Sequence, residues 1–171
     1  QVEYFHVSHS IPDAVGLAIT TPAGLVIHMS AFKFDHPPVD GWPTDFAKLS
    51  EFSTRGVDLL LSDSTNAERP GWTPSESVIG PAFDKVFGEA KGRVIVATFA
   101  SLISRVQQVA DAAAKHGRKM AIAGPSMVDN VKIARKMKYL DIPDEMIVPV
   151  DQAMQMQDHK VVIMCTGSQG E

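Results

Sequence analysis

The sequence has little that supports an extracellular or membrane-spanning protein. Cys165 is the only cysteine among 171 residues, so an internal disulfide and a cysteine-rich zinc site are both excluded. A reducing compartment suits such a chain, and we expect a cytoplasmic protein. No apolar run approaches the roughly 20 residues of a transmembrane helix, so we expect no membrane segment.

Two common phosphate-binding loops are also missing. No strand is followed by Gly-x-Gly-x-x-Gly, and no Gly-Lys-Ser/Thr loop occurs. A nucleotide-binding α/β domain is therefore the weakest of the functions considered. The sequence starts at Gln1 without a Met or a basic and apolar leader, and it stops abruptly at Glu171. These ends predict a segment of a longer protein.

The net charge of −4 hides a basic central block. Residues 91–140 contain 10 Lys/Arg and 2 Asp/Glu, whereas acidic residues dominate on both sides. A local basic surface of this kind suits a partner that carries phosphate groups. Solvated helix faces explain the same counts, so both interpretations stay open.

One stretch, residues 57–66, suggests a functional site. Its apolar run ends in Ser62-Asp63-Ser64-Thr65, which is typical of a strand that is buried and delivers an acid to a sheet edge. Asp63 is therefore the first catalytic candidate. The alternative is that Asp63 and Ser64 only form a turn before Pro70-Gly71.

The hydrophobic pattern divides the chain into two parts. The first is β-rich: we expect strands at 3–9, 15–19, 25–29 and 58–61, a hairpin turn at 21–24, and a helix between Asp45 and Gly56. From residue 73 onward the pattern alternates. Helices are expected at 78–89, 101–116 and from Ser126, which Asp129 would complete as a capping box, and strands at 93–98, 119–123, 146–150 and 161–166. This order predicts an α/β fold with a mostly parallel sheet.

Three similar corners follow strands of that sheet. Each offers a hydroxyl and backbone N–H groups at a turn or helix start, which suits an anion. The candidate phosphate-binding residues are Ser101, Ser126, Thr166, Gly167, Ser168 and Gln169. Ordinary N-capping by serine is the alternative for any single corner.

Histidines are the other candidate ligands. His6 and His9 lie near the end of the first strand, and imidazole suits zinc and similar ions. Three residues apart on a regular strand, they point to opposite faces, so at most one would serve a site. His28 could approach His9 if the strands pair. A packing role is the alternative for each.

Six motifs together resemble bacterial ribonuclease J, of the beta-CASP branch of the metallo-β-lactamase superfamily. They are His9-Ser10-Ile11-Pro12-Asp13, Phe32-Lys33-Phe34-Asp35, residues 62–68, 97–101, 133–137 and 166–171. The resemblance implies part of a metallo-β-lactamase αββα sandwich at 1–72, followed by a beta-CASP α/β domain at 73–171.

The resemblance also implies a chemistry. Members are phosphodiesterases with two metals, usually zinc with manganese or magnesium possible, that cut RNA internally and degrade it from a 5′-monophosphate end. The cations lower the pKa of a bridging water and neutralise phosphoryl charge. By position, His9 is similar to a metal ligand, Asp63 to the signature acid beside the metals, and Ser168 with its neighbours to residues that hold RNA phosphate. Full-length members commonly form homo-oligomers.

Departures from the family pattern matter equally. The acid that bridges the metals should precede Phe32, where this chain has Ser30-Ala31, and Asp35 is not expected to replace it. Leu102 and Pro125 stand where polar or basic residues are usual. Both terminal histidine motifs of the family are absent. We therefore expect a ribonuclease J-like segment that is inactive alone, with a non-catalytic RNA-binding or subunit-interaction module as the rival.

Overall fold

The structure is a computed structural model, and it describes residues 1–167. The chain forms two compact units, which we call unit 1 (Gln1–Ser77) and unit 2 (Val78–Glu171). Among the described residues, no helix is both long and apolar enough to cross a membrane.

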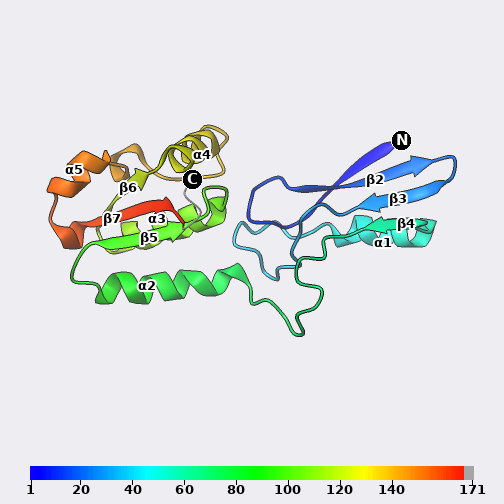
Figure 1. Ribbon diagram of the computed structural model, residues 1–171, viewed down its shortest axis with the longest axis horizontal. Coiled ribbons are helices and arrows are strands. Elements are labelled where there is room, and N and C mark those ends of the chain that lie inside the picture. The colour runs from blue at the N-terminus through cyan, green and yellow to red at the C-terminus, as the bar shows by residue number, and fades with distance from the viewer. Residues whose placement is uncertain (168–171) are drawn as a thin grey trace. The chain divides into compact units, whose positions relative to one another are not determined.

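Unit 1 is built on one four-stranded sheet, sheet A, in the order β1-β2-β3-β4 (Figure 1). Its strands are β1 (Val2–His6), β2 (Val15–Thr21), β3 (Gly24–His28) and β4 (Leu59–Leu61). The first three pair antiparallel, and β4 pairs parallel with β3. The expected hairpin at 21–24 is confirmed. The first strand ends at His6 and not near His9, so His9 lies in the following loop.

Helix α1 (Phe46–Arg55) covers one face of sheet A. It begins where the sequence predicted, because the Asp45 side chain accepts a 2.9 Å hydrogen bond from the Lys48 N–H, and Gly56 ends it with φ 84°. Phe52 of the helix packs edge-on against Phe5 of the sheet, with ring centroids 5.5 Å apart. The core consists of Phe5, Val7, Ala18, Leu25, Ile27, Met29 and Phe52.

The expectation that strand β4 is buried is wrong. Leu59, Leu60 and Leu61 are each about half exposed. The strand forms the edge of sheet A, and it contains only three residues. An apolar run identifies a strand but not what covers it, so burial could not be inferred from the sequence.

Unit 2 alternates helices and strands. Its elements are η1 (Glu76–Val78, which begins in unit 1), α2 (Ile79–Glu89), β5 (Val94–Thr98), α3 (Ile103–Lys115), β6 (Lys119–Ala123), α4 (Pro125–Lys136), η2 (Asp144–Met146), α5 (Val150–Gln155), η3 (Asp158–Lys160) and β7 (Val161–Thr166). The strands form sheet B in the order β5-β7-β6, and both pairs are parallel. The predicted parallel α/β arrangement is confirmed for this unit.

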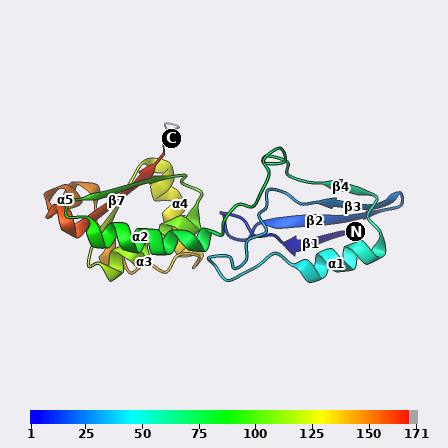
Figure 2. The same cartoon turned by 90° about the horizontal axis from the view of Figure 1, so that it is seen from below.

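Helices cover sheet B unequally. The larger core contains Met120, Val162 and Met164 of the sheet with residues of α2, α3 and α4, and α2 and α3 lie side by side (Figures 1 and 2). The opposite face packs Ala121 and Val161 against Ala153 of the short helix α5. Ile95 of β5 stays 66% exposed, because the six-residue helix α5 packs mainly against β6 and β7.

Two local expectations in unit 2 are wrong. Residues 146–150 form no strand: only Ile147 bridges to Met120, and helix α5 begins at Val150. Ser126 does not cap α4. The helix already starts at Pro125, with Gly124 as its N-cap and no side-chain capping bond. Proline is well suited to the first helical position, so the start falls earlier than the serine suggested.

Candidate functional site

Asp63 lies where the parallel strands β3 and β4 end together. The pairing of His28 with Leu61 brings the segment after each strand to the same sheet edge. A hollow of about 580 Å³ opens there, which we call the Ala31 hollow. Its lining is His28, Ser30, Ala31, Leu60, Leu61, Ser62 and Asp63. The sequence therefore placed Asp63 correctly at a sheet edge.

Asp63 lines a second hollow, of about 300 Å³, which we call the Trp72 hollow. Its lining is Phe32, Lys33, Phe34, Asp63, Thr65, Asn66, Gly71, Trp72 and Thr73. Among the described residues, Asp63 is thus the one that borders both hollows. No sequence signal pointed to the second hollow, because its walls come from separate loops.

The pKa of Asp63 is lowered by its neighbour Thr65. The Thr65 hydroxyl and backbone N–H donate hydrogen bonds to Asp63 Oδ1 at 2.7 and 3.0 Å. These bonds hold the pKa of the exposed Asp63 carboxyl below its ordinary value, and the positive charge of a protonated His9 acts in the same direction. The side chain is therefore an anion at neutral pH. The turn that the alternative interpretation expected is also present.

His9 is exposed, and it lies close enough to Asp63 for its positive charge to lower the pKa of that carboxyl. The other two histidines have contacts of their own. His6 stacks on Trp42 with ring centroids 4.0 Å apart, and its Nδ1 lies 3.0 Å from the Pro43 carbonyl. His28 Nδ1 accepts a 3.2 Å hydrogen bond from the Ser30 N–H. Of the three, His28 borders the Ala31 hollow.

These residues do not fit the two-metal centre that the resemblance implies. In the part of the chain that the structure describes, no three His, Cys, Asp or Glu side chains gather closely enough to hold a metal ion. The position where an acid is expected is Ala31, whose methyl group borders the hollow and cannot ligate a cation. We therefore derive no metal-dependent step from this chain.

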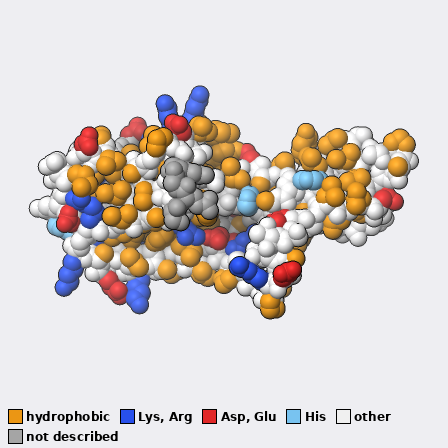
Figure 3. All heavy atoms as spheres, viewed as in Figure 1, with side chains coloured by type: hydrophobic (Ala, Val, Ile, Leu, Met, Phe, Trp, Pro, Cys, Tyr) orange, Lys and Arg blue, Asp and Glu red, His pale blue; other side chains and the backbone are white. Residues whose placement is uncertain are grey.

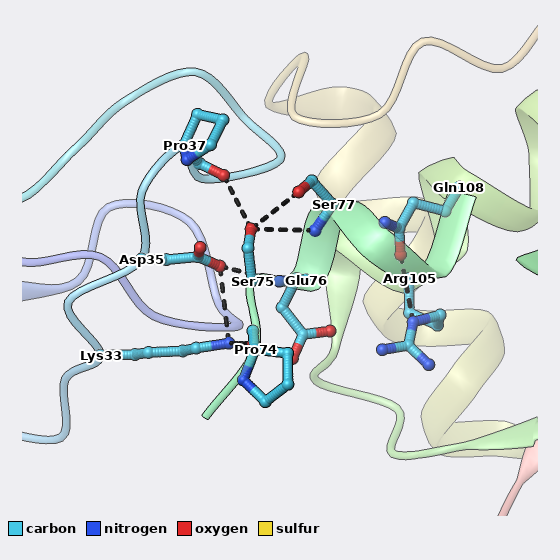
Figure 4. A network of polar contacts seen from close by, with 9 residues as sticks. All are labelled: Lys33, Asp35, Pro37, Pro74, Ser75, Glu76, Ser77, Arg105 and Gln108. Carbon is cyan, nitrogen blue, oxygen red and sulfur yellow. Dashed lines mark hydrogen bonds and ion pairs between the residues drawn. The ribbon is translucent and has the colours of Figure 1, made fainter. Parts of the chain in front are cut away.

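Asp35 belongs to a different arrangement, which we call the Asp35 clamp (Figure 4). Its carboxylate, 4% exposed, accepts a 3.0 Å hydrogen bond from the Glu76 N–H and forms a 3.5 Å ion pair with Lys33. Lys33 Nζ also donates to the Pro74 carbonyl at 2.7 Å. The Ser75 hydroxyl donates to the Pro37 carbonyl at 2.9 Å. The clamp ties the segment after Trp72 to the loop after Ala31.

The predicted phosphate corners follow the ends of parallel strands in unit 2. The strand order places the corner after β7 between those after β5 and β6. Ser101 is exposed before α3, whose N-cap Leu102 makes no side-chain capping bond, and Ser126 lies in the first turn of α4. Serine therefore caps neither helix. The Gly167 N–H donates to the Thr98 carbonyl at 3.1 Å, whereas Ser168 and Gln169 lie outside the described residues.

Much of the basic block is committed to structural contacts. Arg118 is buried, Arg93 pairs with Asp158 at 2.8 Å, and Lys115 pairs with Asp84 at 2.6 Å. Arg135 pairs with Asp144 and donates to the Ile142 carbonyl at 2.8 Å. Lys and Arg side chains are accordingly dispersed over the face of unit 2 seen in Figure 3. Among the described residues, the exposed Lys132 and Lys136 of α4 keep no such partner.

The fold of unit 2 and the sheet-edge corners define a class: a parallel α/β domain with its polar corners at one sheet edge. Residues 91–171 match the family model described as the ribonuclease J beta-CASP domain. This part of the chain is therefore similar to the beta-CASP domain of ribonuclease J, and the resemblance predicted from the motifs is confirmed.

Three relatives of this chain are longer proteins. Ribonuclease J of Helicobacter pylori (strain J99) is 48% identical over 170 residues, which cover 99% of this chain and 25% of the relative. The Corynebacterium glutamicum protein is 50% identical, with 24% of its length covered. The Mycobacterium tuberculosis (strain H37Rv) protein is 47% identical over 171 residues, with 31% covered. The chain thus spans less than a third of these relatives.

One solved structure supports the fold alone. It is a protein of unknown function from Enterococcus faecalis V583, with a TM-score of 0.64 and 14% sequence identity. The match covers 99% of this chain and 42% of that protein. One sheet and one helix layer are present in unit 1, and the complete αββα sandwich stays a prediction.

Proposed function

We propose that this chain is part of a ribonuclease J-like hydrolase that cleaves RNA phosphodiesters, both internally and in the 5′-to-3′ direction from a 5′-monophosphate end. The observation that carries this proposal is the identity of 48% to ribonuclease J over 170 residues. We further propose that the full-length protein is cytoplasmic and forms homo-oligomers. Residues 1–72 then belong to the metallo-β-lactamase domain and 73–171 to the beta-CASP domain.

Within this proposal, the sheet B edge holds RNA phosphates. Ser101, Ser126, Thr166 and Gly167 supply hydroxyl and backbone groups, and Ser168 and Gln169 complete the set. No side chain caps the first turn of α3 or α4, which supports this role, since the N-terminus of a helix attracts anions. Lys132 and Lys136 add positive charge on α4. Such backbone contacts give little sequence preference.

We propose that the chain by itself does not hydrolyse RNA. The full-length enzyme would use metal ions, zinc first and manganese or magnesium as alternatives, with His9 as one ligand and Asp63 as the catalytic acid beside them. The described residues supply too few ligands in one place, and Ala31 replaces the expected acid.

The test is hydrolysis of a 5′-monophosphorylated RNA by the purified chain, with zinc or manganese added, together with the metal content by elemental analysis. The expected result is no turnover and no stoichiometric metal. If the chain hydrolyses the RNA and the His9→Ala variant does not, the proposal that the chain is inactive by itself is wrong. An Ala31→Asp variant serves as the matched comparison, because it adds one carboxylate to the Ala31 hollow. A higher metal content in this variant would support a metal site at this hollow.

A non-catalytic RNA-binding or subunit-interaction module is the second candidate, favoured by Ala31 and by the dispersed ligands. It predicts that replacing Lys132 and Lys136 by Ala weakens RNA binding and reduces the slope of log affinity against log salt by about 1 for each lysine that binds a phosphate. Arg135 is left intact, because its ion pair with Asp144 and its bond to Ile142 are structural. An unchanged slope would count against this candidate.

A further inference from the structure

Trp72 is an unusually exposed aromatic residue. Its side chain is 89% exposed, and the indole borders the Trp72 hollow beside Asp63. The other tryptophan, Trp42, differs: its ring stacks on His6 at a 4.0 Å centroid distance and an angle of 3° between the planes. Among the described residues Trp72 has no such ring partner. A free planar face of this size is available to stack on a ligand.

The polar groups of the hollow select against phosphate. Hydrogen bonds from Thr65 favour the charged form of Asp63. The negative charge of this side chain in the lining repels a phosphate group placed in the hollow. Lys33, the one cation in the lining, already binds the Pro74 carbonyl at 2.7 Å and the Asp35 and Glu76 carboxylates at 3.5 Å. A carboxylate next to an Asn66 amide suits the N–H donors and acceptors on the edge of a nucleobase.

The hollow is also held in shape before any ligand arrives. Trp72 and Thr73 directly precede Pro74, Ser75 and Glu76, which the Asp35 clamp ties to the loop that carries Phe32 and Phe34. The same contacts therefore fix two parts of the lining, residues 32–34 and 72–73. Less conformational entropy is lost on binding when the residues that contact the ligand are already held in place.

We propose that the Trp72 hollow holds an unpaired nucleobase of an RNA strand, stacked on the Trp72 indole and hydrogen-bonded at its edge by Asp63 and Asn66. This rests on the proposed function, because it takes RNA as the ligand. It adds a base-recognition site in unit 1 to the phosphate contacts proposed for unit 2. Stacking tolerates any base, and Asp63 adds a preference for bases with an exocyclic amino group, such as adenine, over uracil, whose single N–H donor lies between two carbonyl oxygens.

The experiment measures binding of a 5′-monophosphorylated ten-residue oligoadenylate to the chain, without added metal. Trp72→Ala should weaken the affinity by roughly 5- to 100-fold, the usual range for loss of one stacked base, and leave the salt dependence unchanged. In Trp42→Phe, where Trp72 is the only tryptophan, the oligonucleotide should quench the fluorescence. Because Trp72 is exposed, its replacement does not threaten folding, which circular dichroism checks.

An abasic oligomer of the same length and charge is the matched control. The chain and its Trp72→Ala variant should bind it equally. If both bind oligoadenylate equally well, or if Trp42→Phe shows no quenching while binding occurs, the base site is refuted and RNA binding by unit 2 stands. If the unmodified chain binds neither oligomer at low salt, RNA binding by this chain fails together with the base site.

Discussion

The backbone N–H of Glu76 donates a 3.0 Å hydrogen bond to Oδ2 of Asp35, which lies 41 residues earlier in the sequence. Lys33 neutralises the same carboxylate at 3.5 Å. The other oxygen, Oδ1, is buried and has no hydrogen-bond partner among the described residues. This carboxylate therefore fastens the last segment of unit 1, and its charge is needed for that role.

The Asp35 clamp should contribute measurably to the stability of unit 1. In Asp35→Asn the ion pair with Lys33 is lost and the hydrogen bond from Glu76 is weakened, so the free energy of unfolding should fall by about 1–3 kcal/mol. Urea unfolding followed by tryptophan fluorescence measures this directly, since both tryptophans lie in unit 1. Asp13→Asn, at an exposed position, is the control and should have no effect.

The same clamp predicts a pH dependence. Burial alone would raise the pKa of Asp35, but the hydrogen bond from the Glu76 N–H and the positive charge of Lys33 lower it below its ordinary value. Because the folded pKa lies below the unfolded one, stabilisation is complete above about pH 4 and is lost as the pH falls through the folded pKa. Urea midpoints measured between pH 7 and pH 3 should fall more steeply for the parent than for Asp35→Asn. Parallel curves would refute the prediction.

The hydroxyl of Thr65 should lower the pKa of Asp63. Thr65→Val removes the 2.7 Å hydroxyl hydrogen bond and leaves the backbone bond. The pKa of Asp63 should therefore rise toward its ordinary value, as an NMR titration of the side-chain carboxyl would show. His9→Ala should change it in the same direction by less, since a more distant charge is removed. An unchanged Asp63 pKa in Thr65→Val would contradict the assignment.

Two glycines should respond differently to alanine. A Cβ on Gly16 would lie 2.2 Å from Cζ of the buried Phe5 ring, so Gly16→Ala should destabilise unit 1 by about 1–3 kcal/mol. Gly80 lies in the first turn of α2, and a Cβ there meets nothing within 4 Å. Gly80→Ala should change the stability of unit 2 by less than about 1 kcal/mol, because the gain in helix propensity is opposed by Pro81, which disfavours a helical backbone in a preceding residue that has a Cβ. Urea titrations of both variants, by fluorescence and circular dichroism, would reveal whether only Gly16→Ala loses stability.

Arg118 should be essential to unit 2 although it belongs to the basic block. Its buried guanidinium donates to the carbonyls of Ala90 at 2.6 Å, Gly92 at 2.9 Å and Val161 at 3.3 Å. Arg118→Met leaves these carbonyls without their donor and should cost about 2–4 kcal/mol. Thermal unfolding by circular dichroism provides the measurement. The control, Lys136→Met, replaces an exposed lysine, and comparable losses in both variants would refute this role.

Local signals in the sequence predicted most elements correctly. Asp45 and Gly56 bracket α1 because capping is decided by neighbouring residues. The turn at 21–24 and the strands of sheet B followed from patterns of turn residues and apolar periodicity. The strand expected at 146–150 failed because apolar β-branched residues also suit a loop that contacts a sheet edge, as Ile147 does.

The sequence by itself determined the family resemblance, the order of the elements, and the presence of Asp63 at a strand end. Only the tertiary structure decided which groups meet. It placed Trp72 beside Asp63, tied Asp35 to Glu76, and removed Arg118 from the surface. The physical reason is range: capping and periodicity act within a few residues, whereas hollows, clamps and buried charges depend on segments that are distant in sequence and adjacent only after folding.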